Sequence, residues 1–171
     1  AMLWPRMRPI TGTPWHALAP EDQILHMAAH VFIDSDCTSR LRDLVDINTL
    51  LLHRCVTEPD FPHMLTARTQ ELNLAAPLSY ALSFVNAWFT HNPEQTHTLN
   101  QISNACSTQF KCSPWVLRLA SQTLPPHHPD SAPTPKERWA TRLLSLRYHG
   151  WRMPVGLLIY HSAMKLLRHL R

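Results

Sequence analysis

The sequence predicts an all-α fold: a multi-helix bundle of about six helices, then a Pro-rich tether and a basic C-terminal helical tail. Apolar residues recur with the helical period along most of the chain. Only three glycines occur in 171 residues, so few positions suit the tight turns of an all-β fold. The composition, 44% hydrophobic and 16% charged, suits a packed core rather than a disordered chain.

These patterns divide the chain into four parts. We expect an extended lead-in over residues 1–17, where prolines and arginines mix with apolar residues without a helical period. The helical bundle follows over residues 18–122. Residues 123–135 are predicted to be a Pro-rich linker, because proline fixes φ and lacks a backbone amide. Residues 136–171 form the basic helical tail.

The first helix is predicted to begin at Pro20, a residue that suits the first helical position. Glu21 and Asp22 follow in the first turn, where carboxylates complement the exposed amides and the helix dipole. The apolar arc of this helix consists of Ile24, Leu25, Met27, Ala28, Val31 and Phe32.

The second helix is expected after Ser39, with Leu44, Ile47 and Leu51 on its apolar side. Asn48 projects from that side, so its amide needs hydrogen-bond partners if it is buried. The remaining helices are predicted from near Asp60 through Leu72, from Pro77 to before Asn92-Pro93, around Leu99 to Phe110, from Ser113-Pro114, from Pro135 to His149, and from Val155 to Leu167.

Composition also excludes some kinds of chemistry and indicates a compartment. Three glycines do not suffice for a phosphate-cradling or dinucleotide-binding loop. None of the four cysteines are spaced as CxxC, which favours free thiols in a reducing compartment. The sequence shows neither a signal peptide nor an uncharged apolar run of about 18 residues. A cytoplasmic location is therefore expected.

We predict no catalytic residue and no metal site in this chain. His26 and His30 are spaced to share one helix face, but no third ligand is indicated. Asp34 and Asp36 lie just past a predicted helix end, where acids usually stop or cap helices. No local signature of a serine or cysteine nucleophile occurs either.

The candidate site consists of four polar residues on the first two helices. Arg42, Asp46 and His53 line one side of the second helix, and the first two are spaced for an i, i+4 pair. His30 faces this strip if the two helices form an antiparallel hairpin. Two interpretations remain open: a polar clamp that fixes helix packing, or a substrate-pocket wall in which Arg42 meets an anion and Asp46 orients a histidine.

The same residues carry a resemblance to a known family, over about residues 4–90. The matching segments are Leu18-Ala19-Pro20-Glu21-Asp22-Gln23-Ile24-Leu25-His26 with His30, then Leu41-Arg42-Asp43-Leu44-Val45-Asp46-Ile47, then Asp60-Phe61 leading to Leu65-Thr66-Ala67 and Leu72-Asn73-Leu74. In order and spacing they resemble the helical part of the uncharacterised bacterial nucleotidyltransferases, which are similar to polymerase-β-like enzymes. Phe61 stands where that family usually has tryptophan.

The resemblance implies that this chain is the C-terminal helical domain of such an enzyme. In the family, a preceding core with a Gly-Ser loop and paired aspartates holds Mg²⁺ and the nucleoside triphosphate. Residues before Leu18 are too few to supply that core, so Mg²⁺ and nucleotide are expected only with an N-terminal nucleotidyltransferase core as partner. The resemblance then implies that His30, Arg42 and Asp46 line a cleft toward the core or a small-molecule or peptide acceptor.

An alternative function rests on charge. Residues 136–171 carry eight basic side chains and one acidic, a net charge of +7, whereas the whole chain carries +4. Such asymmetry suits a non-catalytic helical interaction module whose tail docks on an acidic partner or a phosphate-rich surface. Nucleic acid is not expected as the partner, because no aromatic residues interleave a basic groove.

Overall fold

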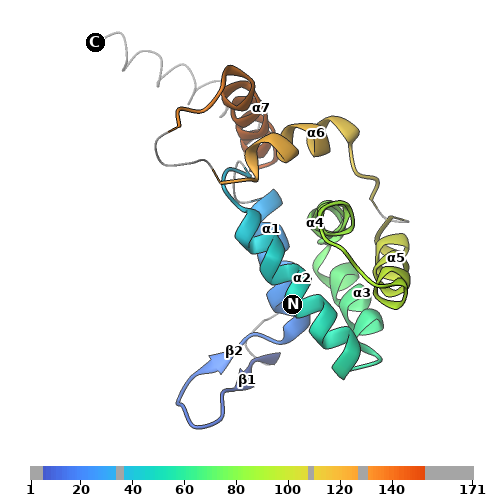
Figure 1. The fold of residues 1–171 in the computed structure, drawn as a ribbon. Coiled ribbons are helices and arrows are strands. Elements are labelled where there is room, and N and C mark those ends of the chain that lie inside the picture. The colour runs from blue at the N-terminus through green and yellow to red at the C-terminus, as the bar shows by residue number, and fades with distance from the viewer. Residues whose placement is uncertain (1–5, 34–36, 108–109, 127–130, 153–171) are drawn as a thin grey trace.

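The computed structural model describes residues 6–33, 37–107, 110–126 and 131–152, and within these residues the protein is a helical bundle (Figure 1). The elements are β1 Arg8–Pro9, β2 His16–Ala17, α1 Pro20–Phe32, α2 Leu41–Thr57, α3 Phe61–Leu72, α4 Ala75–Trp88, α5 Pro93–Ser107, α6 Pro114–Thr123 and α7 Pro135–Arg152. The predicted all-α fold is confirmed. The last predicted helix, Val155 to Leu167, lies outside the described residues.

Helix ends follow local chemistry. Proline occupies the first turn of α1, as predicted, and also that of α3 and α6. Asn73 ends α3 in the left-handed conformation, at φ 54°, which asparagine tolerates better than most residues. At the start of α5, the backbone amide of Gln95 donates to Asn92 Oδ1 at 2.8 Å, and the backbone amide of Asn92 donates to Gln95 Oε1 at 3.0 Å.

The core forms around α4, which packs against α1, α2, α3 and α5. Its most buried side chains include Tyr80, Leu82 and Val85. Phe32 of α1 stacks on Tyr80 at 5.6 Å and on Phe84 at 5.9 Å between ring centroids. These aromatic contacts join the first and fourth helices at the centre of the bundle.

The α6–α7 pair packs together and joins the bundle beside the start of α2. Ser39 donates its amide to the Thr123 carbonyl at 2.8 Å, and Leu41 donates to the Leu124 carbonyl at 3.0 Å. Leu124 itself is fully buried. Residues that the sequence assigns to the beginning of the linker thus contact the bundle directly.

A short hairpin precedes the bundle, where the sequence indicated an extended lead-in. The strands β1 and β2 are antiparallel, with Arg8 opposite Ala17 and Pro9 opposite His16. A hydrogen bond from the backbone amide of Ile10 to the Trp15 carbonyl, at 2.9 Å, closes the turn. Gly12 has a φ of 78° in this turn, a conformation that glycine adopts without strain.

Some helix boundaries differ from the prediction. The fourth helix begins at Ala75 rather than at Pro77, because Pro77 fits within the first turn that Ala75 opens. The four cysteines are free thiols, as predicted. In the part of the chain that the structure describes, no helix has the length and apolar character needed to span a bilayer.

Candidate functional site

The outer face of α2 carries three of the four predicted site residues. Arg42, Asp46 and His53 are all exposed, and at 100° per residue they lie within an arc of about 40°. Over 11 residues this row is about 16 Å long. The opposite side of the helix is fixed in the core by Leu44, Ile47 and Leu51. The amphipathic pattern of α2 therefore presents the three polar side chains to solvent.

None of the four site residues makes a side-chain hydrogen bond or ion pair with another described residue. The i, i+4 pair that their spacing allows between Arg42 and Asp46 is not formed. Instead, Asp43 pairs with Arg40 at 3.5 Å, one helical turn earlier. The interpretation of the four residues as an inter-helix polar clamp is therefore wrong for the structure as described.

His30 lies near the C-terminal end of α1 and is half-buried. Its ring stacks against that of His26, with centroids 6.3 Å apart and an interplanar angle of 11°. Among the described residues, no group of three His, Cys, Asp or Glu side chains is placed to hold a metal ion.

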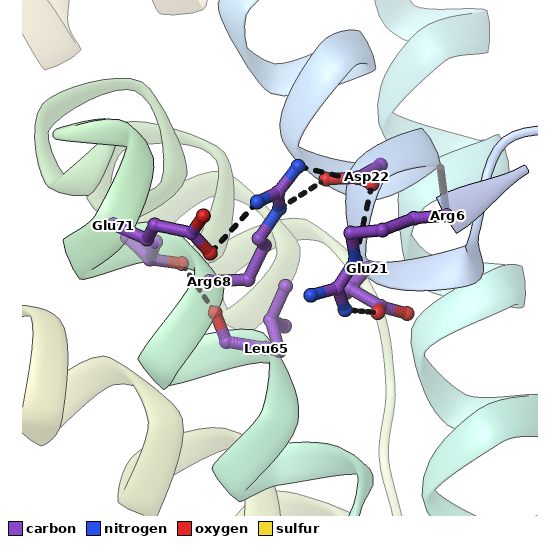
Figure 2. A network of polar contacts seen from close by, with 7 residues as sticks. Arg6, Glu21, Asp22, Leu65, Arg68 and Glu71 are labelled. Atoms are coloured by element: carbon purple, nitrogen blue, oxygen red, sulfur yellow. Dashed lines mark hydrogen bonds and ion pairs between the residues drawn. The ribbon is translucent and has the colours of Figure 1, made fainter. Parts of the chain in front are cut away.

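A buried polar contact between helices lies elsewhere, between α1 and α3. Arg68 donates from Nε to Asp22 Oδ1 at 2.6 Å, and its Nη2 lies 3.4 Å from Asp22 Oδ2 (Figure 2). Both side chains are almost fully buried, at 2% and 0% exposure. On the other side of the guanidinium, Nη1 lies 2.7 Å from Oε2 of Glu71. The two contacts to Asp22 form a fork, the geometry of the strongest arginine–carboxylate pairs.

The N-terminal segment completes this network from the opposite side. Arg6, just before β1, forms an ion pair with Glu21, and its Nε lies 3.8 Å from Asp22 Oδ2 (Figure 2). The other carboxylate oxygen of Glu21, Oε2, is buried without a hydrogen-bond partner among the described residues. The network thus connects the lead-in, α1 and α3, and Arg6 supplies a positive charge beside two buried acids.

Sequence reasoning missed this network. It assigned Glu21 and Asp22 to the helix dipole, whereas both are buried in ion pairs. The available signal was Arg68, which lies at helical spacing on the apolar stripe of Phe61, Leu65 and Leu72. A charge on a core-facing stripe requires a partner of opposite sign.

The ion pair between Arg68 and Glu71 shifts the pKa values of these two side chains in opposite directions. Hydrogen bonds to Asp22 and Glu71 raise the pKa of Arg68, so this guanidinium stays charged despite its burial. The hydrogen bond from Arg68 lowers the pKa of Glu71 below its ordinary value. Glu71 is half-exposed, so solvent weakens its share of the interaction.

We expect Glu71→Gln to lower stability at pH 7 but not at low pH. A carboxylate whose pKa is depressed in the folded state stabilises the protein above its unfolded-state pKa of about 4.3. This contribution is lost as the pH falls through the lower pKa of the folded state. Urea unfolding of both proteins from pH 7 to pH 2 measures the difference. The exposed neighbour Gln70 provides the control, because Gln70→Ala should have a pH-independent effect; a constant difference for Glu71→Gln would contradict the coupling.

Asn48 has the partner that its position requires. Its Oδ1 lies 2.9 Å from Nε2 of His91, which follows α4. The half-buried side chain thus has a partner in the connection between α4 and α5, which is what a buried amide at this position requires.

A cavity of about 370 Å³ lies between the C-terminal half of α2 and the start of α5. Its walls combine apolar side chains, most of them from α2, with polar side chains at the start of α5; the lining residues are Leu51, Leu52, Cys55, Val56, Pro59, Asn92, Glu94, Gln95, Thr98 and Leu99. Burial raises the pKa of the Cys55 thiol to about 11. The thiol therefore stays protonated at neutral pH and lines the cavity as an uncharged group, not as a nucleophile. None of the four predicted site residues lines the cavity.

Comparison with known proteins places these features in a family. The family described as uncharacterised nucleotidyltransferases matches residues 1–90, slightly more than half of the chain. The chain belongs to the uncharacterised nucleotidyltransferase family. No curated protein and no solved structure matches it. The matched residues of this nucleotidyltransferase-related protein include α1 to α4, with the outer face of α2 and the buried network, whereas α5 to α7 follow them.

Proposed function

We propose that this chain is the substrate-recognition domain of a nucleotidyltransferase, in which His30, Arg42, Asp46 and His53 line a cleft that faces a catalytic core. One observation carries the proposal. Within the residues that match the family, α2 holds two charges and an imidazole in an exposed row, and no described residue satisfies them. Such a row is suited to binding another molecule, because the groups need not break internal bonds to do so.

Each side chain has a role that fits its chemistry. The guanidinium of Arg42 would bind a phosphate or carboxylate in a two-point contact. Asp46 would accept a hydrogen bond from the acceptor hydroxyl or orient a histidine. His30 and His53 would donate or accept hydrogen bonds through their ring nitrogens. The row therefore suits an anionic group beside a hydroxyl.

The reaction itself would belong to the partner core. There the acceptor oxygen forms a bond to the α-phosphorus of the nucleoside triphosphate, pyrophosphate leaves with the electrons of the broken bond, and the hydroxyl proton passes to solvent. Carboxylates of that core would hold the Mg²⁺ and the nucleotide. The present chain would select and position the acceptor, which in this proposal is a small molecule or peptide.

The test is nucleotidyl transfer by this chain co-expressed with a catalytic core of the same family, followed as pyrophosphate release from Mg-ATP. We expect Arg42→Ala and Asp46→Ala each to lower the rate about ten- to a hundredfold, the effect of losing a charged hydrogen bond of about 1.5–3 kcal/mol. Stability should change little, because both side chains are exposed.

Two matched variants control for nonspecific charge effects. Arg118 on α6 and Asp60 before α3 are also exposed and make no described side-chain contact. Arg118→Ala and Asp60→Ala should leave pyrophosphate release unchanged. If Arg42→Ala and Asp46→Ala behave like these controls, the α2 row does not form the substrate-facing surface.

A further inference from the structure

One side of α7 attaches this helix to the bundle. Ala140 and Leu144 are buried on that side. One turn further, the Arg147 guanidinium lies 5.3 Å from the ring centroid of Tyr80 and donates to the carbonyl of Phe32 at 3.4 Å. These contacts fix the rotation of α7 about its axis, so the side that faces solvent is determined.

The solvent side carries a stripe of large apolar residues. Trp139, Leu143 and Leu146 are 62%, 43% and 55% exposed, and their spacing places them on one line along the helix. At 100° per residue, this stripe is rotated about 90–100° from the buried side. A stripe of large exposed apolar side chains is typical of a surface that binds a membrane or another protein.

Cationic side chains flank the stripe. Lys136, Arg138 and Arg142 are exposed, and the guanidinium of Arg142 lies 5.7 Å from the Trp139 ring centroid. Glu137, the sole acid of α7, is engaged in a capping box: it accepts a hydrogen bond from the Thr134 amide at 2.6 Å, and its own amide donates to Thr134 Oγ1 at 3.3 Å. The outward surface of α7 is therefore apolar and positively charged.

We propose that this surface docks on an anionic lipid membrane, with Trp139, Leu143 and Leu146 entering the interface and Lys136, Arg138 and Arg142 meeting lipid phosphates. The helix would lie in the membrane plane, as basic amphipathic helices with tryptophan do. Two features favour lipid over an acidic protein. Figure 1 shows α7 at the end of the molecule opposite the hairpin, where it can approach a flat surface. The other feature is the composition of the solvent side of α7, where tryptophan and leucine lie beside basic residues, as in helices that lie in an anionic lipid interface.

The test is co-sedimentation of the full chain with vesicles of phosphatidylcholine containing about 30% phosphatidylglycerol, against vesicles of phosphatidylcholine alone. We expect binding to the anionic vesicles at low salt, weakening as salt is added. Arg138→Gln combined with Arg142→Gln should weaken binding about 25-fold, since each basic residue near such a surface contributes about fivefold. Leu143→Ala combined with Trp139→Ala should also weaken it.

A matched control uses the same residue types at the far end of the molecule. Arg8 and Trp15 lie on the hairpin and are exposed, Trp15 at 70%. Arg8→Gln combined with Trp15→Ala should bind vesicles like the unaltered protein. Lipids brominated on their acyl chains should quench tryptophan fluorescence in the unaltered protein and less in Trp139→Ala, which reports entry of this indole into the interface.

Several results would overturn the proposal. Absence of binding to anionic vesicles at low salt would do so, as would equal losses in the α7 variants and the hairpin control. Binding without quenching would exclude insertion of Trp139. Binding to soluble polyglutamate but not to vesicles would identify an acidic protein as the partner instead. Circular dichroism of each variant establishes that the exposed substitutions leave the helices folded.

Discussion

Arg68→Ala is expected to lower the free energy of unfolding by about 3–5 kcal/mol, which is the cost of leaving a buried charge without its partner. The Asp22 carboxylate, fully buried, would lose the guanidinium that contacts it at 2.6 Å. Arg6 does not replace that contact, because its Nε lies 3.8 Å from Oδ2 of Asp22, too far for a hydrogen bond. Urea unfolding at pH 7, followed by circular dichroism, measures the loss.

Two comparisons separate burial from charge. Arg54 pairs with Glu58 at 2.6 Å, but both side chains are 29% exposed. Arg54→Ala should therefore cost no more than about 1 kcal/mol. Arg68→Met combined with Asp22→Leu should be more stable than Arg68→Ala alone, because the Asp22 carboxylate is then not left buried without its guanidinium partner. A loss for Arg68→Ala no larger than that for Arg54→Ala would show that the buried pair is not important for stability.

Phe32→Ala is expected to cost about 3–5 kcal/mol, because it opens a cavity where the ring fills the core between α1 and α4. Phe32 is 2% exposed and stacks on both Tyr80 and Phe84. The loss would also weaken the attachment of α7, because the Tyr80 ring that Arg147 contacts packs against the Phe32 side chain; the backbone carbonyl of residue 32, which also accepts from Arg147, is retained. Guanidinium chloride unfolding at constant pH measures the change.

Volume and position provide the controls. Phe32→Leu keeps most of the side-chain volume and should cost less than about 1.5 kcal/mol. Trp15→Ala removes a larger aromatic side chain at an exposed position and should change stability by no more than about 0.5 kcal/mol. If Phe32→Ala and Phe32→Leu cost the same, filling of the core at this position is not what stabilises the bundle.

Most of the helical architecture was predictable because its signals are local. The proline at the start of α1 and the apolar arc from Ile24 to Phe32 lie within one segment of sequence, and the structure confirms both. The hairpin was not predictable in the same way. It contains only two residue pairs, Pro9 occupies one of its strands, and no alternation of apolar and polar residues marks it.

The candidate site was predictable only where exposure follows from helical periodicity. Arg42, Asp46 and His53 lie on the solvent side of α2 because the leucines opposite them enter the core. Their internal contacts did not follow from spacing, since Asp43 rather than Asp46 has an arginine partner. The pairing of Asp22 with Arg68 spans 46 residues, and no local pattern in α1 indicates which distant side chain reaches it.

The ion pair between Arg6 and Glu21 has a practical consequence for expressing the protein. A shortened polypeptide starting at Leu18 would keep every described helix, yet it would remove the guanidinium that neutralises Glu21, whose side chain is only 2% exposed. The shortened protein would contain a buried Glu21 carboxylate without its cationic partner. The leading residues, although not helical, therefore belong in any shortened version intended for crystallisation or spectroscopy.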